Sequence, residues 1–145
     1  MQPNRYAINA YHSAQLTTPP LTAVVMLYDG IMVRIAAAGE AARKGDFDRQ
    51  FKMVMSAARI IDGLNRCLDM EQGGSVAVSL REMYESVARA LFRSVGRESG
   101  SEVAERLVAA VRMTRDAWAE VAGLPPSSTS TTVSELPPAL REDTP

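Results

Sequence analysis

The chain has 145 residues, of which 46% are hydrophobic and 23% are charged, which is the balance of an ordinary soluble domain with a real core. Its net charge of -1 gives no basic surface for nucleic acid or an anionic membrane. Cys67 is the single cysteine, so an internal disulfide framework is excluded. The opening "MQPNRYAINAYH" lacks the apolar core of a signal peptide, and we expect a cytosolic protein with no membrane insertion.

The N-terminal arm, residues 1–17, carries a short amphipathic pattern. Ala7, Ala10, Tyr11 and Ala14 share one side, and Ile8 lies next to them. A helix of about ten residues is not stable alone in water. We therefore expect the arm to dock on the rest of the protein as a short capping helix, or to fray.

Four helix-length segments follow in residues 18–122. The first opens at "TTPPL", with Thr18 as N-cap, and ends before Gly45. The second runs from near Asp46 to the glycine pair 73–74, and the third from near Ser75 to Val95. The fourth begins at "SGSE", where Ser99 and Glu102 have capping-box spacing, and ends near Val121.

Apolar residues recur at helical spacing in all four segments, and no segment alternates with period two. The expected core faces are Leu21, Val24, Tyr28, Ile31, Ile35 and Ala38 in the first helix; Phe47, Phe51, Val54, Ala58, Ile61 and Leu68 in the second; Val76, Leu80, Met83, Val87 and Leu91 in the third; and Val103, Leu107, Ala110, Thr114, Ala117 and Val121 in the fourth, with Trp118 beside them. Short loops make neighbouring helices antiparallel, so we predict an all-α, up-down-up-down four-helix bundle.

The C-terminal end, residues 123–145, is rich in Pro, Ser and Thr and cannot bury a core. We expect a disordered tail.

A second apolar stripe lies roughly opposite the core face of the first two helices. Its members are Met26, Gly30 and Val33 in the first helix, and Met53, Ile60 and Cys67 in the second. Glycine costs about 1 kcal/mol against alanine inside a helix, and it allows another backbone to come close. We interpret the stripe as a surface that receives an apolar partner helix. The alternatives are further core between neighbouring helices, or cover by the N-terminal arm.

Catalytic chemistry is poorly supported. His12 is the only histidine, which excludes the paired Glu-x-x-His motifs of di-iron bundles, and one Cys with one His does not make a zinc site. The carboxylates Asp29, Asp62, Asp69 and Glu71 are interpreted as solvated helix charges or caps, and Arg115 and Asp116 beside Trp118 as packing plus solvation. We expect no enzyme, no cofactor and no metal.

Three motifs in order resemble one family. "LYDG" at residues 27–30 follows a Thr-Pro helix start, "LDMEQGG" at 68–74 precedes Tyr84, and "RDAW" at 115–118 closes the fourth helix. Over residues 7–122 the chain resembles the FliS family of flagellar secretion chaperones. The departures are "TTPP" in place of the usual Thr-Ala-Ser-Pro type of start, and a longer tail.

The resemblance implies a bundle with a short N-terminal cap that binds the disordered C-terminal segment of flagellin in the cytosol. The segment becomes helical as it wraps around the bundle, premature polymerisation is blocked, and delivery to the flagellar type III export gate follows. The family's arm lies over part of the client groove, and its isoleucine and tyrosine correspond to Ile8 and Tyr11. The residues themselves leave two alternatives open, a homodimeric helical-bundle adaptor and a bundle enzyme or redox protein.

Overall fold

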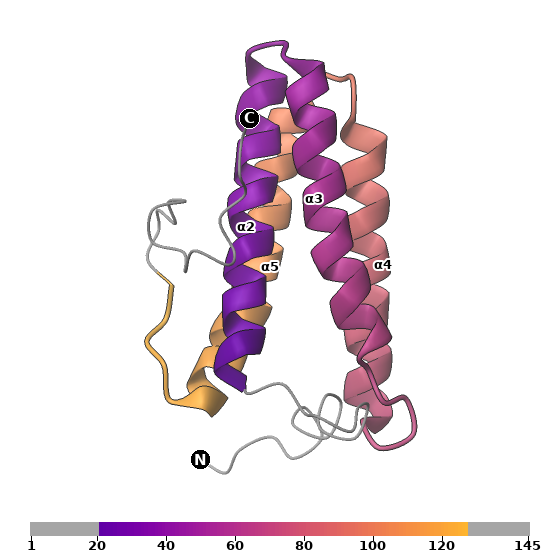
Figure 1. The fold of residues 1–145 in the computed structure, drawn as a ribbon, viewed down its shortest axis with the longest axis vertical. Coiled ribbons are helices and arrows are strands. Elements are labelled where there is room, and N and C mark those ends of the chain that lie inside the picture. Colours follow the sequence, from indigo (N-terminus) through magenta and orange to yellow (C-terminus); the bar gives the residue numbers. More distant parts are fainter. Residues whose placement is uncertain (1–20, 128–145) are drawn as a thin grey trace.

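The computed structural model describes residues 21–127, and within them it contains four helices and no strand. These are α2 (Leu21–Arg43), α3 (Phe47–Arg66), α4 (Gly74–Ser94) and α5 (Gly100–Ala122). Short loops join them in sequence, so consecutive helices are antiparallel (Figure 1). α2 makes its most extensive contacts with α5 and α3, while α4 is packed less closely. The predicted all-α four-helix bundle is confirmed. The N-terminal arm, the helix start at Thr18 and residues 128–145 lie outside the described residues.

Most helix ends follow the sequence signals. Asp46 caps α3 by accepting a hydrogen bond from the backbone N–H of Arg49 at 3.2 Å. Gly45 and Gly96 take the left-handed conformation after α2 and α4, with φ of 74° and 79°. The predicted capping box is wrong, because Ser99 makes no side-chain cap hydrogen bond at the start of α5.

The second helix ends earlier than predicted, at Arg66 rather than at the glycine pair 73–74. Asp69 explains the difference. Its Oδ1 accepts the backbone N–H groups of Glu71 and Gln72, both at 3.0 Å, and so closes a turn in place of another helical turn. Asp69, predicted to be a solvated helix charge or cap, lies in the loop instead, and the N-cap of α4 is Gly73.

The core lies between all four helices. In α2 the predicted face is confirmed, since Val24, Tyr28, Ile31, Ile35 and Ala38 are all buried. The hydroxyl groups of Tyr28 and Tyr84 hydrogen-bond to each other across the core, and the ring centroids are 6.3 Å apart. This bond ties α2 to α4 without leaving the two hydroxyls unpaired in an apolar interior.

Three predicted core residues are exposed, one in α3 and two in α5. Phe51 of α3 is exposed, because the helix turns that side toward solvent. In α5 the buried face is shifted by one residue from the predicted face, so that Ala110 and Ala117 are exposed. The buried side chains of α5 are instead Ala104, Val111, Arg115, Trp118 and Ala119.

Gly39 allows a close approach between α2 and α5. A Cβ at this position would lie 2.5 Å from the Cβ of Ala104, which is far inside contact distance.

α2 is the one described helix that is long and apolar enough to cross a membrane by length and composition. More than half of that stretch is buried inside the bundle, as in the core helix of a soluble protein, so the membrane signal is weak.

Candidate partner-binding surfaces

The predicted second stripe is only partly exposed. Met26 is 37% exposed, and Ile60 and Cys67 are half-buried. Val33 and Met53 are each only 7% exposed, and Gly30 is buried as well. The expectation of an exposed stripe is therefore wrong for these three residues. The assignment of all six residues as partner contacts stays a prediction, and Ile8 and Tyr11 lie outside the described residues.

Gly30 is needed inside the bundle. A Cβ there would lie 3.2 Å from Nη1 of Arg34 and 3.4 Å from Cδ1 of Ile60. Arg34 is buried, and it donates from Nε to Oγ of Ser56 at 2.7 Å and from Nη1 to the carbonyl of Gly30 at 3.0 Å. The glycine makes room for an α2–α3 contact within the chain, which is the alternative that the sequence left open.

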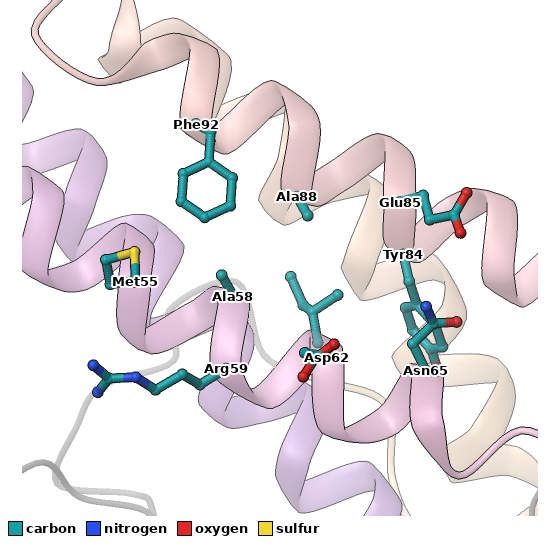
Figure 2. Close-up of a pocket in the computed structure, with 10 residues that line it drawn as sticks. Met55, Ala58, Arg59, Asp62, Asn65, Tyr84, Glu85, Ala88 and Phe92 are labelled. Atoms are coloured by element: carbon teal, nitrogen blue, oxygen red, sulfur yellow. The ribbon is translucent and has the colours of Figure 1, made fainter.

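An apolar groove lies between α3 and α4, on another face of the bundle (Figure 2). Its volume is about 370 Å³, and its walls carry Met55, Ala58 and Ile61 from α3 and Ala88 and Phe92 from α4. Phe92 and Met55 lie at one end, and Tyr84 and Asn65 lie at the other (Figure 2).

The floor of the groove consists of small side chains, and its edges carry charged ones. Ala58 and Ala88 face it with single methyl groups, which keeps the two helices from filling the space between them. Arg59, Asp62 and Glu85 add charges along the lining. An apolar floor with a polar edge is suited to the apolar face of an amphipathic segment.

The sequence reading missed this groove. The available signal was that Phe92 and Met55 are large apolar residues outside the expected core faces of their helices, and Phe92 is half-exposed in the structure. No cluster of three His, Cys, Asp or Glu side chains within residues 21–127 could hold a metal ion.

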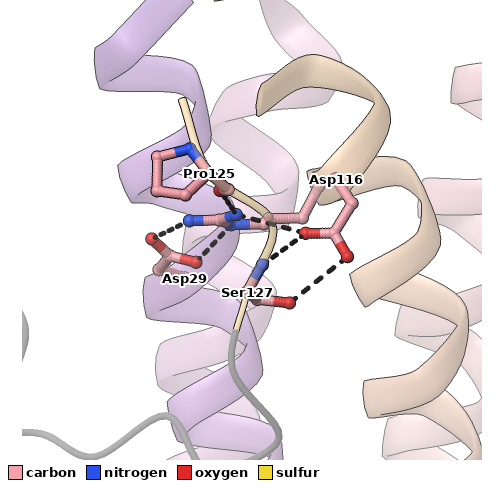
Figure 3. Close-up of polar contacts among 5 residues, drawn as sticks. Asp29, Asp116, Pro125 and Ser127 are labelled. Carbon is pink, nitrogen blue, oxygen red and sulfur yellow. Dashed lines mark hydrogen bonds and ion pairs between the residues drawn. The ribbon is translucent and has the colours of Figure 1, made fainter. Parts of the chain in front are cut away.

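Arg115 joins two of the sequence motifs (Figure 3). Its Nε donates to Oδ1 of Asp29 at 2.8 Å, and its Nη2 donates to Oδ2 at 3.3 Å, a two-point pair between "RDAW" of α5 and "LYDG" of α2. Its Nη1 donates to Oδ1 of Asp116 at 3.1 Å and to the carbonyl of Pro125 at 2.9 Å. We call Asp29, Arg115 and Asp116 the latch. The interpretation of Asp29 as a solvated charge or cap is wrong. For Trp118 with Arg115 and Asp116, the expected packing is confirmed by the burial of Trp118 and Arg115, and the expected solvation is wrong for Arg115.

Burial lowers the pKa of Arg115, but the hydrogen bonds and charges of Asp29 and Asp116 outweigh it and raise the pKa above its ordinary value. Burial likewise raises the pKa of Asp116, but hydrogen bonds from the Ser127 backbone, Arg115 and the Ser127 hydroxyl leave that pKa below its ordinary value. Both groups are charged at neutral pH, as the latch requires.

The chain turns back after α5 and is held by the latch. Gly123 has a φ of 73°, and the N–H of Leu124 donates to the carbonyl of Ala119 at 2.8 Å, which forms a Schellman turn. Ser127 then donates from its backbone N–H to Oδ1 of Asp116 at 2.9 Å. We call residues 123–127 the strap. The predicted tail therefore begins with five residues that are bound to the bundle.

Comparison with known proteins gives the family. The model of the family described as "Flagellar protein FliS" matches residues 3–125. The chain belongs to the FliS family. It is 28% identical to the flagellar secretion chaperone FliS of Salmonella typhimurium over 117 residues, which cover 80% of this chain and 86% of that one. It is 29% identical to the protein of the same name from Campylobacter jejuni over 119 residues, which cover 81% and 92%.

Membership of the FliS family confirms the resemblance carried by the three motifs. The protein is a flagellar secretion chaperone by family, and not an enzyme. The match to the family ends at residue 125, inside the strap, so residues 126–145 lie beyond the part that FliS proteins share.

Proposed function

We propose that this chain is a cytosolic export chaperone for flagellin. It binds the C-terminal segment of flagellin, prevents premature polymerisation, and delivers the client to the flagellar type III export apparatus. Membership of a family of flagellar secretion chaperones supports the class of activity. Flagellin is proposed as the client because it must stay unassembled until export.

The observation that carries the proposal is the apolar groove between α3 and α4. A segment that folds as it binds loses about 2–5 kcal/mol of interaction energy in ordering, so it needs extended apolar contact to compensate. Phe92 and Met55 provide large apolar side chains, and the floor at Ala58 and Ala88 gives space for those of the client.

The outer side of the α2–α3 pair provides a second contact surface for a client that wraps around the bundle. Met26 is exposed there, and Ile60 and Cys67 are half-buried. Residues Ile8 and Tyr11 of the N-terminal arm act as an internal plug that leaves when the client arrives. Capture is stoichiometric, and no covalent bond changes.

The test is calorimetric titration of the chain with a peptide of the flagellin C-terminal segment. Ala58→Glu in the groove, and Met26→Asp and Ile60→Asp on the outer side, should each weaken binding at least about tenfold, since each places a charge against apolar client surface. Met113→Asp is the matched control, because Met113 is 77% exposed on α5, away from both surfaces.

Circular dichroism must show the same helicity in all four variants. Unchanged affinity in Ala58→Glu would show that the client does not bind in the groove. Unchanged affinity in Met26→Asp and Ile60→Asp would show that it does not bind the second surface. Absence of binding by the unaltered chain, together with a dimer in light scattering that the peptide does not dissociate, would favour the alternative of a homodimeric adaptor.

A further inference from the structure

The strap gives the last part of the chain an unusual starting point. Ser127 is bonded to Asp116, six residues before the end of α5, so the chain leaves the bundle from the side of α2 and α5 (Figures 1 and 3). A helix that simply frayed at Ala122 would release the tail from the end of the bundle. The latch uses four side-chain hydrogen bonds from Arg115 and two from Ser127 to prevent this.

Two rows of residues continue from the latch along the contact between α2 and α5, and we call them the outer seam. Helical spacing places Val33 and Ala36 of α2 in line with Asp29, and Arg112 and Ala109 of α5 in line with Asp116. The register is set by the pair Asp29–Arg115 at one level and the close approach of Gly39 to Ala104 at another. Ala36 and Ala109 are exposed.

Within the outer seam, Arg112 carries a hydrogen-bond donor that is unsatisfied among the described residues. It lies one helical turn from Asp116, and its Nε is buried without a hydrogen-bond partner in the part of the chain that the structure describes. A buried guanidinium N–H that makes no hydrogen bond is costly, and a carboxylate is its best acceptor.

The segment after the strap has matching chemistry. Residues 128–140 read "STSTTVSELPPAL", and their single charged side chain is the carboxylate of Glu135. Val133, Leu136 and Leu140 provide apolar contacts, and the proline pair 137–138 favours an extended chain after Glu135 that needs no helical hydrogen bonds. We propose that residues 128–140 dock along the outer seam, with Glu135 paired to Arg112, and that the latch delivers them there.

The distances allow this. Arg112 lies about 6 Å along α5 from Asp116, at 1.5 Å per residue, and the eight residues from Ser127 to Glu135 span up to about 26 Å. The segment starts from Ser127, which is held beside the outer seam by Asp116. It therefore meets this surface at a high effective concentration. The docked segment covers Ala36 and Ala109, which are exposed, and keeps them from other chains. This inference does not depend on the identity of the client.

Cross-linking of the full chain tests the docking. In a Cys67→Ser background, the seam pair is Ala36→Cys with Ser134→Cys, and the control pair is Val78→Cys with Ser134→Cys, since Val78 is exposed on α4. The seam pair should form an intramolecular disulfide under mild oxidation at least about tenfold faster than the control pair. Asp116→Asn, which weakens the hold on Ser127, should reduce this preference.

The ion pair is tested by charge exchange. Arg112→Glu should slow formation of the seam disulfide, and adding Glu135→Arg should restore it, with helicity checked by circular dichroism. Equal rates for the seam and control pairs would overturn the proposal. Disulfides that form mainly between molecules would show that a second copy of the chain, and not the tail, occupies the outer seam. A faster link from Ile8→Cys to Ala36→Cys would assign the seam to the N-terminal arm instead.

Discussion

The latch makes a quantitative prediction for Arg115→Met. The Arg115 and Asp29 side chains are only 10% and 19% exposed. Removing the guanidinium leaves the Asp29 carboxylate and the carbonyl of Pro125 without this partner. Breaking a buried ion pair costs about 3–5 kcal/mol, and an exposed pair contributes less than about 1 kcal/mol. The partial exposure of the latch places the expected loss at about 2–3 kcal/mol.

The assay is urea and thermal unfolding of the full chain, followed by circular dichroism at neutral pH. The loss should lower Tm by roughly 10 °C for a domain of this size. Arg115→Lys keeps the charge but not the two-point geometry, so it should recover part of the loss.

Arg66→Met is the matched control, because Arg66 pairs with Asp62 at 3.0 Å in the open, with side chains 79% and 58% exposed. The loss of this i,i+4 pair should cost less than about 0.5 kcal/mol. A cost for Arg115→Met that matches the control would refute the interpretation of the latch as the main polar tie between α2 and α5.

Three further predictions concern packing and charge. Gly39→Ala should destabilise the fold by about 1–3 kcal/mol in urea, because its methyl group would overlap Ala104, whereas Gly63→Ala, with no atom near its Cβ, should stabilise by about 0.5–1 kcal/mol; equal effects would contradict the close approach. Gln50→Leu should cost about 1–3 kcal/mol in the same assay, since the buried amide bonds the carbonyl of Ser94 at 2.8 Å and the N–H of Gly96 at 2.9 Å; a neutral result would contradict that role. The pKa of Asp116 is lowered below 3.8 in the folded state. The contribution of Asp116 to the free energy of unfolding is therefore present above its unfolded pKa and is lost as pH falls through its folded pKa. Asp116→Asn should make stability fall less steeply below about pH 4, and an unchanged fall would argue against the strap.

The bundle follows from local signals in the sequence. The spacing of Val24, Tyr28, Ile31 and Ile35 identifies the buried face of α2, and Gly45 and Gly96 mark helix ends because only glycine adopts a positive φ easily. Errors at helix ends came from competing side chains, such as Asp69, whose hydrogen bonds close a turn where the apolar pattern continues.

Long-range contacts could not be predicted from one sequence. Arg115 has the sequence pattern of a solvated charge, but it is buried and pairs with Asp29, which lies 86 residues away in the chain. That burial shifts the inner face of α5 by one residue. The same limit applies to Gly30 and Val33, since periodicity identifies a second stripe but not whether a neighbouring helix covers it.

The α3–α4 groove was missed for a related reason. It exists because two alanines from separate helices, Ala58 and Ala88, face the same space. Neither residue is distinctive within its own helix. Their register depends on the loop between Arg66 and Gly74, whose geometry the apolar pattern does not determine.

Seeded polymerisation of flagellin measures the central claim most directly. Purified monomeric flagellin is mixed with short filament seeds, and elongation is followed by light scattering with and without an equimolar amount of this chain. The account predicts that elongation stops at one chain per flagellin and that a flagellin without its C-terminal segment is not bound. Elongation at an unchanged rate in the presence of the folded chain would contradict it.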